Sequence, residues 1–156
     1  MPEDVVRSLY LPLGLGPSCE GLLVPLAVVA EIVAYVPPVP PGAAGDWVLG
    51  SVAWRGHALA VGSAERLLGR VAARPGTRTR IAVLHALGVG PALRYYGLVL
   101  RDLPNVIAVA EGAVRWIDAG RPRPGTMVGL VEAGARYAWI PDLGAIERDL
   151  AARRGA

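Results

Sequence analysis

The chain has no lysine and no phenylalanine, and it has a single cysteine among its 156 residues. One cysteine cannot form a disulfide within the chain, so the disulfide framework of many small secreted domains is excluded. The opening sequence MPEDVVRSLYLPLG carries two acidic residues before its first arginine, which is the wrong polarity for a signal peptide. With 53% hydrophobic and 19% charged residues, the chain is too apolar to be disordered and long enough to bury a core.

Charge is scarce in one long stretch, from Gly21 to Gly45, which has to be considered as a membrane span. A helix that crosses a bilayer needs about 20 consecutive apolar residues. Pro25 and Glu31 interrupt the stretch, and the proline-rich segment PPVPPGAAG at residues 37–45 ends it. We therefore expect a loop at 37–45 and no direct insertion into a membrane.

Basic charge is spread along the whole chain. All 16 basic residues are arginines, and the formal net charge at pH 7 is +3. Nucleic-acid-binding proteins tend to gather basic residues on one face and to place aromatic residues among them. The scattered arginines therefore argue against a nucleic-acid partner, and a basic nucleic-acid-binding barrel is the least favoured alternative.

Recognisable catalytic and metal-binding motifs are absent from the sequence. It has no CxxC, HExxH, GxSxG or phosphate-binding loop. His57 and His85 lie in separate strand-like runs, and Cys19 has no histidine near it. The Gly-Leu-Gly at residues 14–16 and the Gly-Val-Gly at 88–90 are each followed by proline, so both are expected to be turns. We therefore expect no catalysis, no cofactor and no bound metal, and we favour a binding module.

The tryptophans are expected mainly in the core, and His85 is expected in the core or at an interface. His85 alternates with Ile81 and Val83, which predicts a hydrogen-bonded core or interface histidine. The tryptophans are expected to fill the core, with one or two at a strand end available to anchor a partner. They are Trp47, Trp54, Trp116 and Trp139.

Short apolar runs alternate with glycine and proline breaks, which is typical of a protein built from many short strands. The run at 47–54 has apolar residues on both faces, which predicts a strand buried on both sides. Few helices are expected, so the pattern indicates an all-β barrel or a pair of barrels. The expected strands are residues 9–15, 22–25, 32–36, 47–54, 57–61, 80–86, 93–100, 106–111, 113–117, 127–132 and 136–140.

Three helical segments are expected between these strands and after them. Residues 26–31 are compatible with one or two helical turns. Ser63 is placed to cap a short helix at 64–68, and Gly69 is placed to end it. A terminal helix begins at residue 141 or 142 and carries an apolar face of Leu143, Ile146 and Leu150.

Three stretches in a fixed order resemble the CheW-like domain. The first is Val28-x-x-Glu31-Ile32, and the last is Gly129 followed by YAWIPDL at residues 137–143. The middle stretch has Gly50, then Ala53-Trp54-Arg55-Gly56, Leu59 and Leu67-Leu68-Gly69. Each motif alone is unspecific, but their order and spacing agree with the family over nearly the whole chain.

The sequence departs from the family pattern at four places. Ala53-Trp54 replaces an Asn-Leu pair, Ala60 replaces a proline, Gly62-Ser63-Ala64 lacks an aspartate, and Arg101 replaces an acidic residue. These departures suit a divergent relative, such as the coupling proteins of type IV pilus (twitching) systems.

The resemblance implies an all-β fold of two small five-stranded SH3-like barrels that share a hydrophobic core, with a few short helices and a C-terminal helix. It implies a single domain over residues 1–156, with a core from about residue 9 to about residue 150 and two intertwined barrel subdomains. It also implies a cytoplasmic, non-enzymatic adaptor in a chemosensory pathway, with control of twitching as one outcome. The implied partners are the regulatory domain of a CheA-type histidine kinase and the cytoplasmic tip of a methyl-accepting chemoreceptor, which would bring the protein into membrane receptor arrays. From the residues alone, a small β-barrel ligand-binding protein or enzyme stays open as the alternative.

In this family the receptor docks in a groove near the Val-x-x-Glu-Ile segment, and the arginine of the Arg-Gly turn lies near that glutamate. The resemblance therefore implies a partly buried ion pair between Glu31 and Arg55, whose planar guanidinium suits a carboxylate. The apolar members of the groove are equally compatible with burial in the core. The implied groove residues are Val28, Glu31, Ile32, Leu49, Val52, Arg55 and Gly56.

Overall fold

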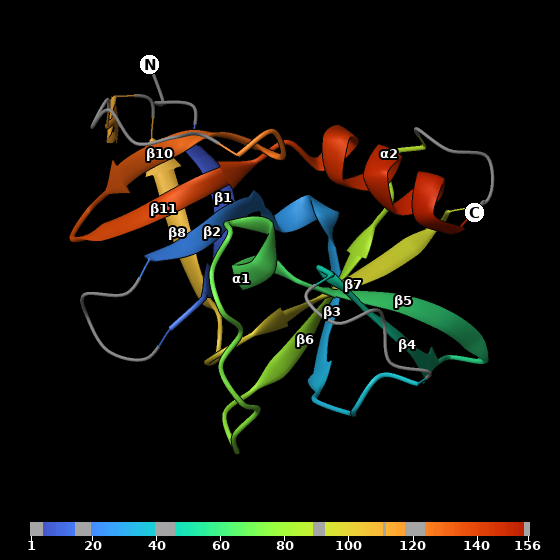
Figure 1. Cartoon of the computed structure of the whole chain (residues 1–156). Coiled ribbons are helices and arrows are strands. Elements are labelled where there is room, and N and C mark those ends of the chain that lie inside the picture. Colours follow the sequence, from blue (N-terminus) through green and yellow to red (C-terminus); the bar gives the residue numbers. More distant parts are fainter. Residues whose placement is uncertain are drawn as a thin grey trace.

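Eleven short strands carry the fold in the part of the chain that the computed structural model describes, residues 5–14, 20–39, 46–88, 93–110, 112–117 and 124–154 (Figure 1). Cys19 and Glu111, like the second glycine of each Gly-x-Gly segment, lie outside these residues. The helical elements are the 3-10 turn η1 Leu26–Val28, helix α1 Ala64–Leu67 and helix α2 Leu143–Arg154. The strands are β1 Val5–Pro12, β2 Glu20–Pro25, β3 Val29–Ala34, β4 Val48–Trp54, β5 His57–Ser63, β6 Arg80–His85, β7 Tyr95–Leu100, β8 Asn105–Ala110, β9 Val114–Trp116, β10 Met127–Ala133 and β11 Arg136–Pro141.

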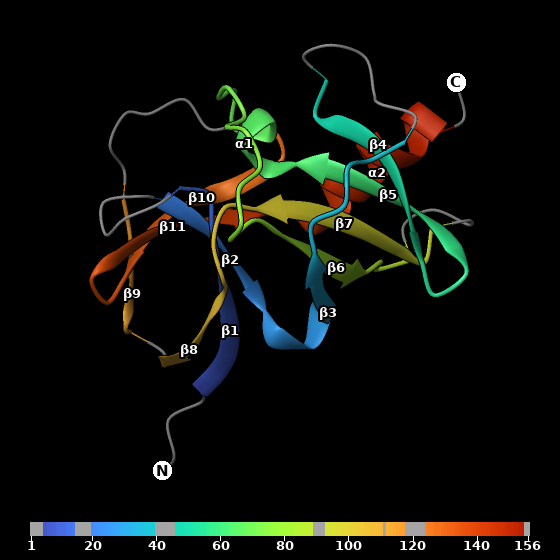
Figure 2. The same ribbon diagram turned by 90° about the horizontal axis from the view of Figure 1, so that it is seen from below.

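The strands form two sheets. The chain first forms β1 and β2 of the first sheet, then all of the second sheet from β3 to β7, and finally β8 to β11 of the first sheet. The first sheet has the order β8-β1-β2-β11-β10-β9, and the second has the order β3-β6-β7-β5-β4. Figure 2 shows β1, β8 and β9 on one side of the molecule and β3, β4 and β5 on the other. Two sheets with few helices confirm the predicted all-β class. The first sheet has six strands where five were expected, because the short β9 pairs with β10.

The strands in the middle of each sheet are buried on both faces. One face packs into a core enclosed by that sheet alone, and the other packs into a common core that the two sheets share. Side chains alternate between the faces of a strand. In β6, Ile81 and Val83 pack inside the second sheet, whereas Ala82 and Leu84 join the common core. That core also takes residues from β1, β2, β10, β11 and α2. This double burial explains how 53% hydrophobic residues fit a chain of this length.

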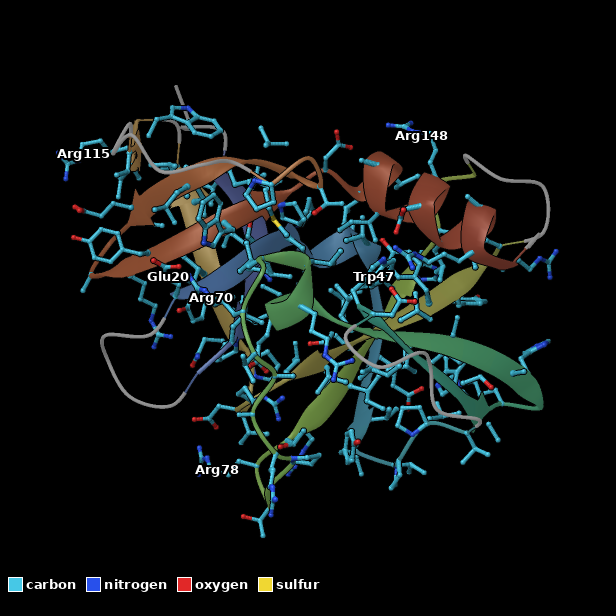
Figure 3. The ribbon with its side chains drawn as sticks, viewed as in Figure 1. Glu20, Trp47, Arg70, Arg78, Arg115 and Arg148 are labelled. Atoms are coloured by element: carbon cyan, nitrogen blue, oxygen red, sulfur yellow. The ribbon has the colours of Figure 1, made fainter. Side chains whose placement is uncertain are left out.

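Helix α2 covers the common core and is tied to the second sheet by a polar contact. Ile146 and Leu150 are buried, as the sequence predicts. Asp142 Oδ1 accepts a hydrogen bond from Ala145 N at 3.0 Å, so the helix is capped where it begins. Trp47, labelled in Figure 3, donates from Nε1 to Asp149 Oδ2 at 2.5 Å. The segment that enters β4 is thereby held against α2.

The short helix α1 follows the predicted capping pattern. Ser63 Oγ accepts a hydrogen bond from Arg66 N at 3.3 Å, which satisfies one of the free N–H groups of the first turn. Gly69 follows the helix with φ of 74°, a conformation that glycine adopts without steric cost.

One local expectation is wrong and a second holds in part, and the strand pairing explains both. Residues 47–54 were expected to be buried on both sides, but β4 is an outer strand of the second sheet, with Val52 and Trp54 buried and Ala53 exposed. Residues 26–31 were expected to form one or two helical turns, and the structure has one 3-10 turn, η1, at Leu26–Val28. From Val29 onward the chain pairs with β6, and this pairing satisfies its backbone groups as strand.

The tryptophans follow the expectation of mainly core positions, with one exposed at a strand end. Trp47, Trp54 and Trp139 are buried, whereas Trp116, on the outer strand β9, is 58% exposed. His85 was expected in the core or at an interface, and the core alternative is wrong. His85 is the last residue of β6 and is exposed, because the strand runs past the buried part of the sheet at this end.

Candidate functional site

Arg55 and Gly56 form the two-residue turn between β4 and β5, in which Trp54 pairs with His57. Both residues have positive φ, 46° for Arg55 and 76° for Gly56. Two positive φ values in a two-residue hairpin loop are the mark of a type I′ turn, which favours Asn-Gly. An L-residue in the left-handed region costs about 1–2 kcal/mol. Arginine is therefore sterically unfavourable at this position of the turn.

Two contacts hold the Arg55 side chain. Its Nη2 lies 3.2 Å from Glu31 Oε2, and its Cζ lies 5.0 Å from the centroid of the Trp54 ring. The side chains of Arg55 and Glu31 are 68% and 38% exposed, so solvent screens their attraction. Exposed ion pairs contribute about 0.2–1 kcal/mol, and exposed cation–π contacts about 0.5–1 kcal/mol. These gains only offset the cost of the turn, so the fold gains little from an arginine here.

The contacts of Glu31 join the two outer strands of the second sheet. Glu31 lies on β3, and Trp54 ends β4 at the opposite edge. Glu31 Oε2 accepts a hydrogen bond from Trp54 Nε1 at 2.9 Å and also faces Arg55. A second contact joins the same side of the sheet: Val39 N, beyond the end of β3, donates to Ser51 O on β4 at 2.7 Å. The predicted proximity of Glu31 and Arg55 is thus present in the structure. The pair lies at the surface where β3 approaches the end of β4, and Arg55 is exposed rather than partly buried.

Two residues that the sequence analysis did not assign to the site lie at the same end of the second sheet. The rings of Trp54 and Tyr95 have centroids 4.8 Å apart, and those of Tyr95 and His85 are 5.2 Å apart. Tyr95 and His85 pair across β7 and β6. Both stand at the facing ends of two consecutive predicted strands, which is the sequence signal that could have placed them together. We call Glu31, Trp54, Arg55, His85 and Tyr95 the Arg55 cluster.

The apolar residues of the implied groove do not share one face. Val28 and Ile32 are half-buried and pack against the common core. Leu49 is half-buried and Val52 is 8% exposed, and both pack inside the second sheet. Because Val52 is covered by its own sheet, it cannot contact a partner directly. The structure therefore brings Glu31 and Arg55 together but divides the four apolar residues between two cores.

The described residues also bear on metal and membrane binding. Among them, no three histidine, cysteine, aspartate or glutamate side chains lie together as metal ligands would. No helix within the described ranges is long and apolar enough to cross a membrane.

The fold and the site together define the class of protein: an all-β module of two sheets around a common core, with an exposed, anchored arginine. A family model described as the CheW-like domain matches residues 15–150, so the chain belongs to this family. This match confirms the family that the three sequence stretches resemble.

Comparison with solved structures supports the same fold. The chain is similar to the scaffolding protein TtCheW from Thermoanaerobacter tengcongensis, with a TM-score of 0.67 and 17% sequence identity. The match covers 92% of this chain and 87% of the other. It bears out the predicted arrangement of two SH3-like barrels with a C-terminal helix. No curated protein matches the sequence.

Proposed function

We propose that this protein is a non-enzymatic adaptor that couples chemoreceptors to a CheA-type histidine kinase in a chemosensory pathway. The observation that carries the proposal is the family match over residues 15–150. The similar solved structure is itself named a scaffolding protein. An adaptor needs exposed contact surfaces rather than a catalytic centre, and the described residues offer such surfaces at the edges of both sheets.

We place the contact with the receptor's cytoplasmic tip at the Arg55 cluster. Arg55 is 68% exposed, yet Glu31 and Trp54 hold its side chain at the turn between β4 and β5. A guanidinium held in place loses less side-chain entropy on binding than a free one. Val28, Ile32 and Leu49 are half-buried against two different cores, so each contributes only its exposed part to the contact, while Val52 and Gly56 act indirectly through the sheet and the turn.

We place the kinase contact at β8, an outer strand of the first sheet. Outer strands carry unpaired backbone groups that another chain can extend. Val106 on β8 is 63% exposed and Leu103 just before it is 47% exposed, which gives this edge apolar side chains beside the backbone groups. Val106→Glu should therefore weaken binding to the kinase's regulatory domain. Val71→Glu is the matched control, because Val71 is 94% exposed and lies in the segment after α1.

Calorimetric titration with the kinase regulatory domain and with the receptor tip tests the proposal. We expect micromolar affinity, about −8 kcal/mol, for the kinase domain. Val106→Glu should weaken this binding at least about tenfold, or 1.4 kcal/mol, while Val71→Glu leaves it unchanged. Absence of binding to every CheA-type kinase of the source organism would overturn the adaptor proposal.

We further propose that residues 1–156 act as one cytoplasmic domain that joins receptor arrays and controls type IV pilus twitching. The topology supports a single domain, since the first sheet is completed only after the second is built. Unfolding should then occur in one cooperative transition. Deletion of the gene should abolish twitching and leave swimming intact, and the reverse pattern would contradict the pilus assignment.

A further inference from the structure

A cavity of about 410 Å³ lies where the two sheets meet, away from the Arg55 cluster. Its lining includes Arg74, Gly76, Thr77, Arg78, Thr79 and Arg101. The first five belong to the loop that precedes β6, on which Figure 3 labels Arg78, and Arg101 directly follows β7. Arg101 N donates to Pro12 O at 3.0 Å, and Pro12 ends β1. The cavity therefore touches the point at which the chain leaves the second sheet to return to the first.

The guanidinium of Arg101 is buried and incompletely paired. Its side chain is 8% exposed, and its Nε donates to Glu65 Oε1. The other oxygen of that carboxylate, Oε2, accepts a hydrogen bond from Ala73 N at 3.1 Å. Arg101 Nη1 is buried and has no acceptor among the described residues. A buried charged donor without an acceptor is unfavourable, so an acceptor that reaches this group would stabilise the structure.

The loop on the other side of the cavity is held in place by its own hydrogen bonds. Gly76 N donates to Thr79 Oγ1 at 2.8 Å, and Thr79 is buried. Arg80 Nη1 donates to the carbonyls of Thr77 and Thr79, at 2.9 Å each. Thr79 Oγ1 accepts one bond here, and its own hydrogen is available to donate. The loop is therefore a preformed wall that presents hydroxyl groups.

The charge around the cavity favours an anion. Arg74, Arg78 and Arg101 line it. Two carboxylates oppose them: Glu65 pairs with Arg101, and Asp102 accepts from Arg78 Nε at 2.7 Å. One positive charge is left over, that of Arg74, which is exposed at the rim. Guanidinium groups bind phosphate oxygens with two N–H groups at once, and threonine hydroxyls add further donors.

We propose that this cavity binds a phosphate group, either as inorganic phosphate or on a small organic phosphate. A tetrahedral phosphate has enough oxygens to meet donors from more than one arginine and from a hydroxyl, whereas a carboxylate is satisfied by one guanidinium. The cavity volume exceeds that of a single phosphate ion, so it leaves room for a small organic group. A bound phosphate would bridge the loop before β6 and the end of β7, and it would stabilise the junction between the sheets.

Thermal unfolding and calorimetry at constant ionic strength test this proposal with inorganic phosphate, glycerol phosphate and acetate as probes. We expect saturable binding of one or both phosphates, a rise in the unfolding temperature with their concentration, and no such effect of acetate. Stronger binding of glycerol phosphate would identify an organic phosphate as the ligand, and equal binding would identify the free ion.

Arg74→Gln should weaken phosphate binding at least about tenfold and leave the unfolding temperature without phosphate unchanged, because Arg74 is exposed. Arg115→Gln, on the outer strand β9, is the matched control and should bind phosphate as the unaltered chain does. Effects of phosphate that acetate reproduces, or equal binding by Arg74→Gln and the unaltered chain, would overturn the proposal. Kinase and receptor binding should be the same for all these variants, so failure here is distinct from failure of the adaptor function.

Discussion

Two glutamate–arginine pairs in this molecule share the same chemistry and differ in burial. The side chains of Glu31 and Arg55 are 38% and 68% exposed, whereas those of Glu65 and Arg101 are 7% and 8% exposed. An exposed pair can be removed with little effect on folding, because water solvates each charge that is left. A buried pair cannot lose one member without leaving a charge in an apolar surrounding. The buried pair therefore belongs to the fold, and the exposed pair is available for binding.

The backbone at each arginine reinforces this difference. Arg101 directly follows β7, and its N–H donates to Pro12 O on β1, so both its backbone and its side chain connect elements of the fold. Arg55 occupies a left-handed turn position that Asn or Gly would fill at lower cost. An arginine that the fold does not need, placed where arginine is unfavourable, points to a contact outside the chain.

Breaking the buried pair should have the largest effect on stability. Arg101→Met leaves the Glu65 carboxylate buried without its cation and should lower the free energy of unfolding by about 3–5 kcal/mol. The double variant with Glu65→Gln should lose less, because the neutral amide oxygen can still accept from Ala73 N. Urea unfolding in a buffer without phosphate measures both. A loss below about 1 kcal/mol for Arg101→Met would show that the pair is not buried in solution.

A second buried glutamate, Glu147 on α2, sharpens the comparison because, unlike Glu65, it has no arginine in direct contact among the described residues. Glu147 is 1% exposed, its Oε1 accepts from Leu87 N at 2.5 Å, and its Oε2 has no partner among the described residues. Burial raises the pKa of this carboxyl, against the opposing effects of the N–H groups of Leu87 and Gly88 and of the charge of Arg148. The nearby Tyr96 hydroxyl is likewise buried, and burial and the charge of Glu147 raise its pKa.

The raised pKa fixes the direction of a pH effect. Because the folded chain holds the Glu147 proton more tightly than the unfolded chain, protonation favours folding. The stabilisation from this proton is complete below the pKa that Glu147 has in the unfolded chain. It is lost as the pH rises through the pKa of Glu147 in the folded chain. Glu147→Gln cannot lose it, so the variant should become more stable than the unaltered chain as pH rises from about 4 to about 8. Urea unfolding across this range measures the difference, with the more exposed Glu132→Gln as control. A difference that is constant with pH would contradict the prediction.

The exposed pair should show the smallest effect. A double-mutant cycle on Glu31→Gln and Arg55→Met isolates the interaction between the two side chains. Because both are exposed, we expect a coupling energy of about 0.2–1 kcal/mol in unfolding experiments. A coupling above about 2 kcal/mol would mean that the pair is desolvated in solution and belongs with Glu65 and Arg101.

Much of the fold could be predicted from local patterns in the sequence. Ser63 and Gly69 mark the limits of α1, and the apolar face of α2 is visible in Ile146 and Leu150. The position of β4 could not be predicted, because apolar residues on both faces do not reveal that a strand lies at the edge of its sheet. The proximity of Glu31 and Arg55 followed from the family resemblance and not from the spacing of the residues.

The buried pair escaped the sequence analysis because its members are 36 residues apart and lie in different elements. In the sequence, Glu65 stands in the first turn of the short helix, where acidic residues are common, so it gives no sign of a buried partner. Arg101 directly follows the apolar strand β7, which was the available signal of a buried charge that needs a partner. Tyr95 and His85 could likewise not be assigned to the Arg55 cluster from the sequence, because their contacts depend on the pairing of β6 with β7.

The most direct test of the account is to replace Arg55 by asparagine and to measure stability and receptor binding on the same preparation. Asparagine suits the type I′ turn and removes the charge. We expect the free energy of unfolding to stay within about 1 kcal/mol of the unaltered chain. Affinity for the receptor tip should fall at least about tenfold, or 1.4 kcal/mol. Arg115→Gln, which removes a similarly exposed arginine from the pair with Glu132, should change neither quantity. Receptor binding that is unchanged by Arg55→Asn would contradict the claim that this arginine is kept for a partner.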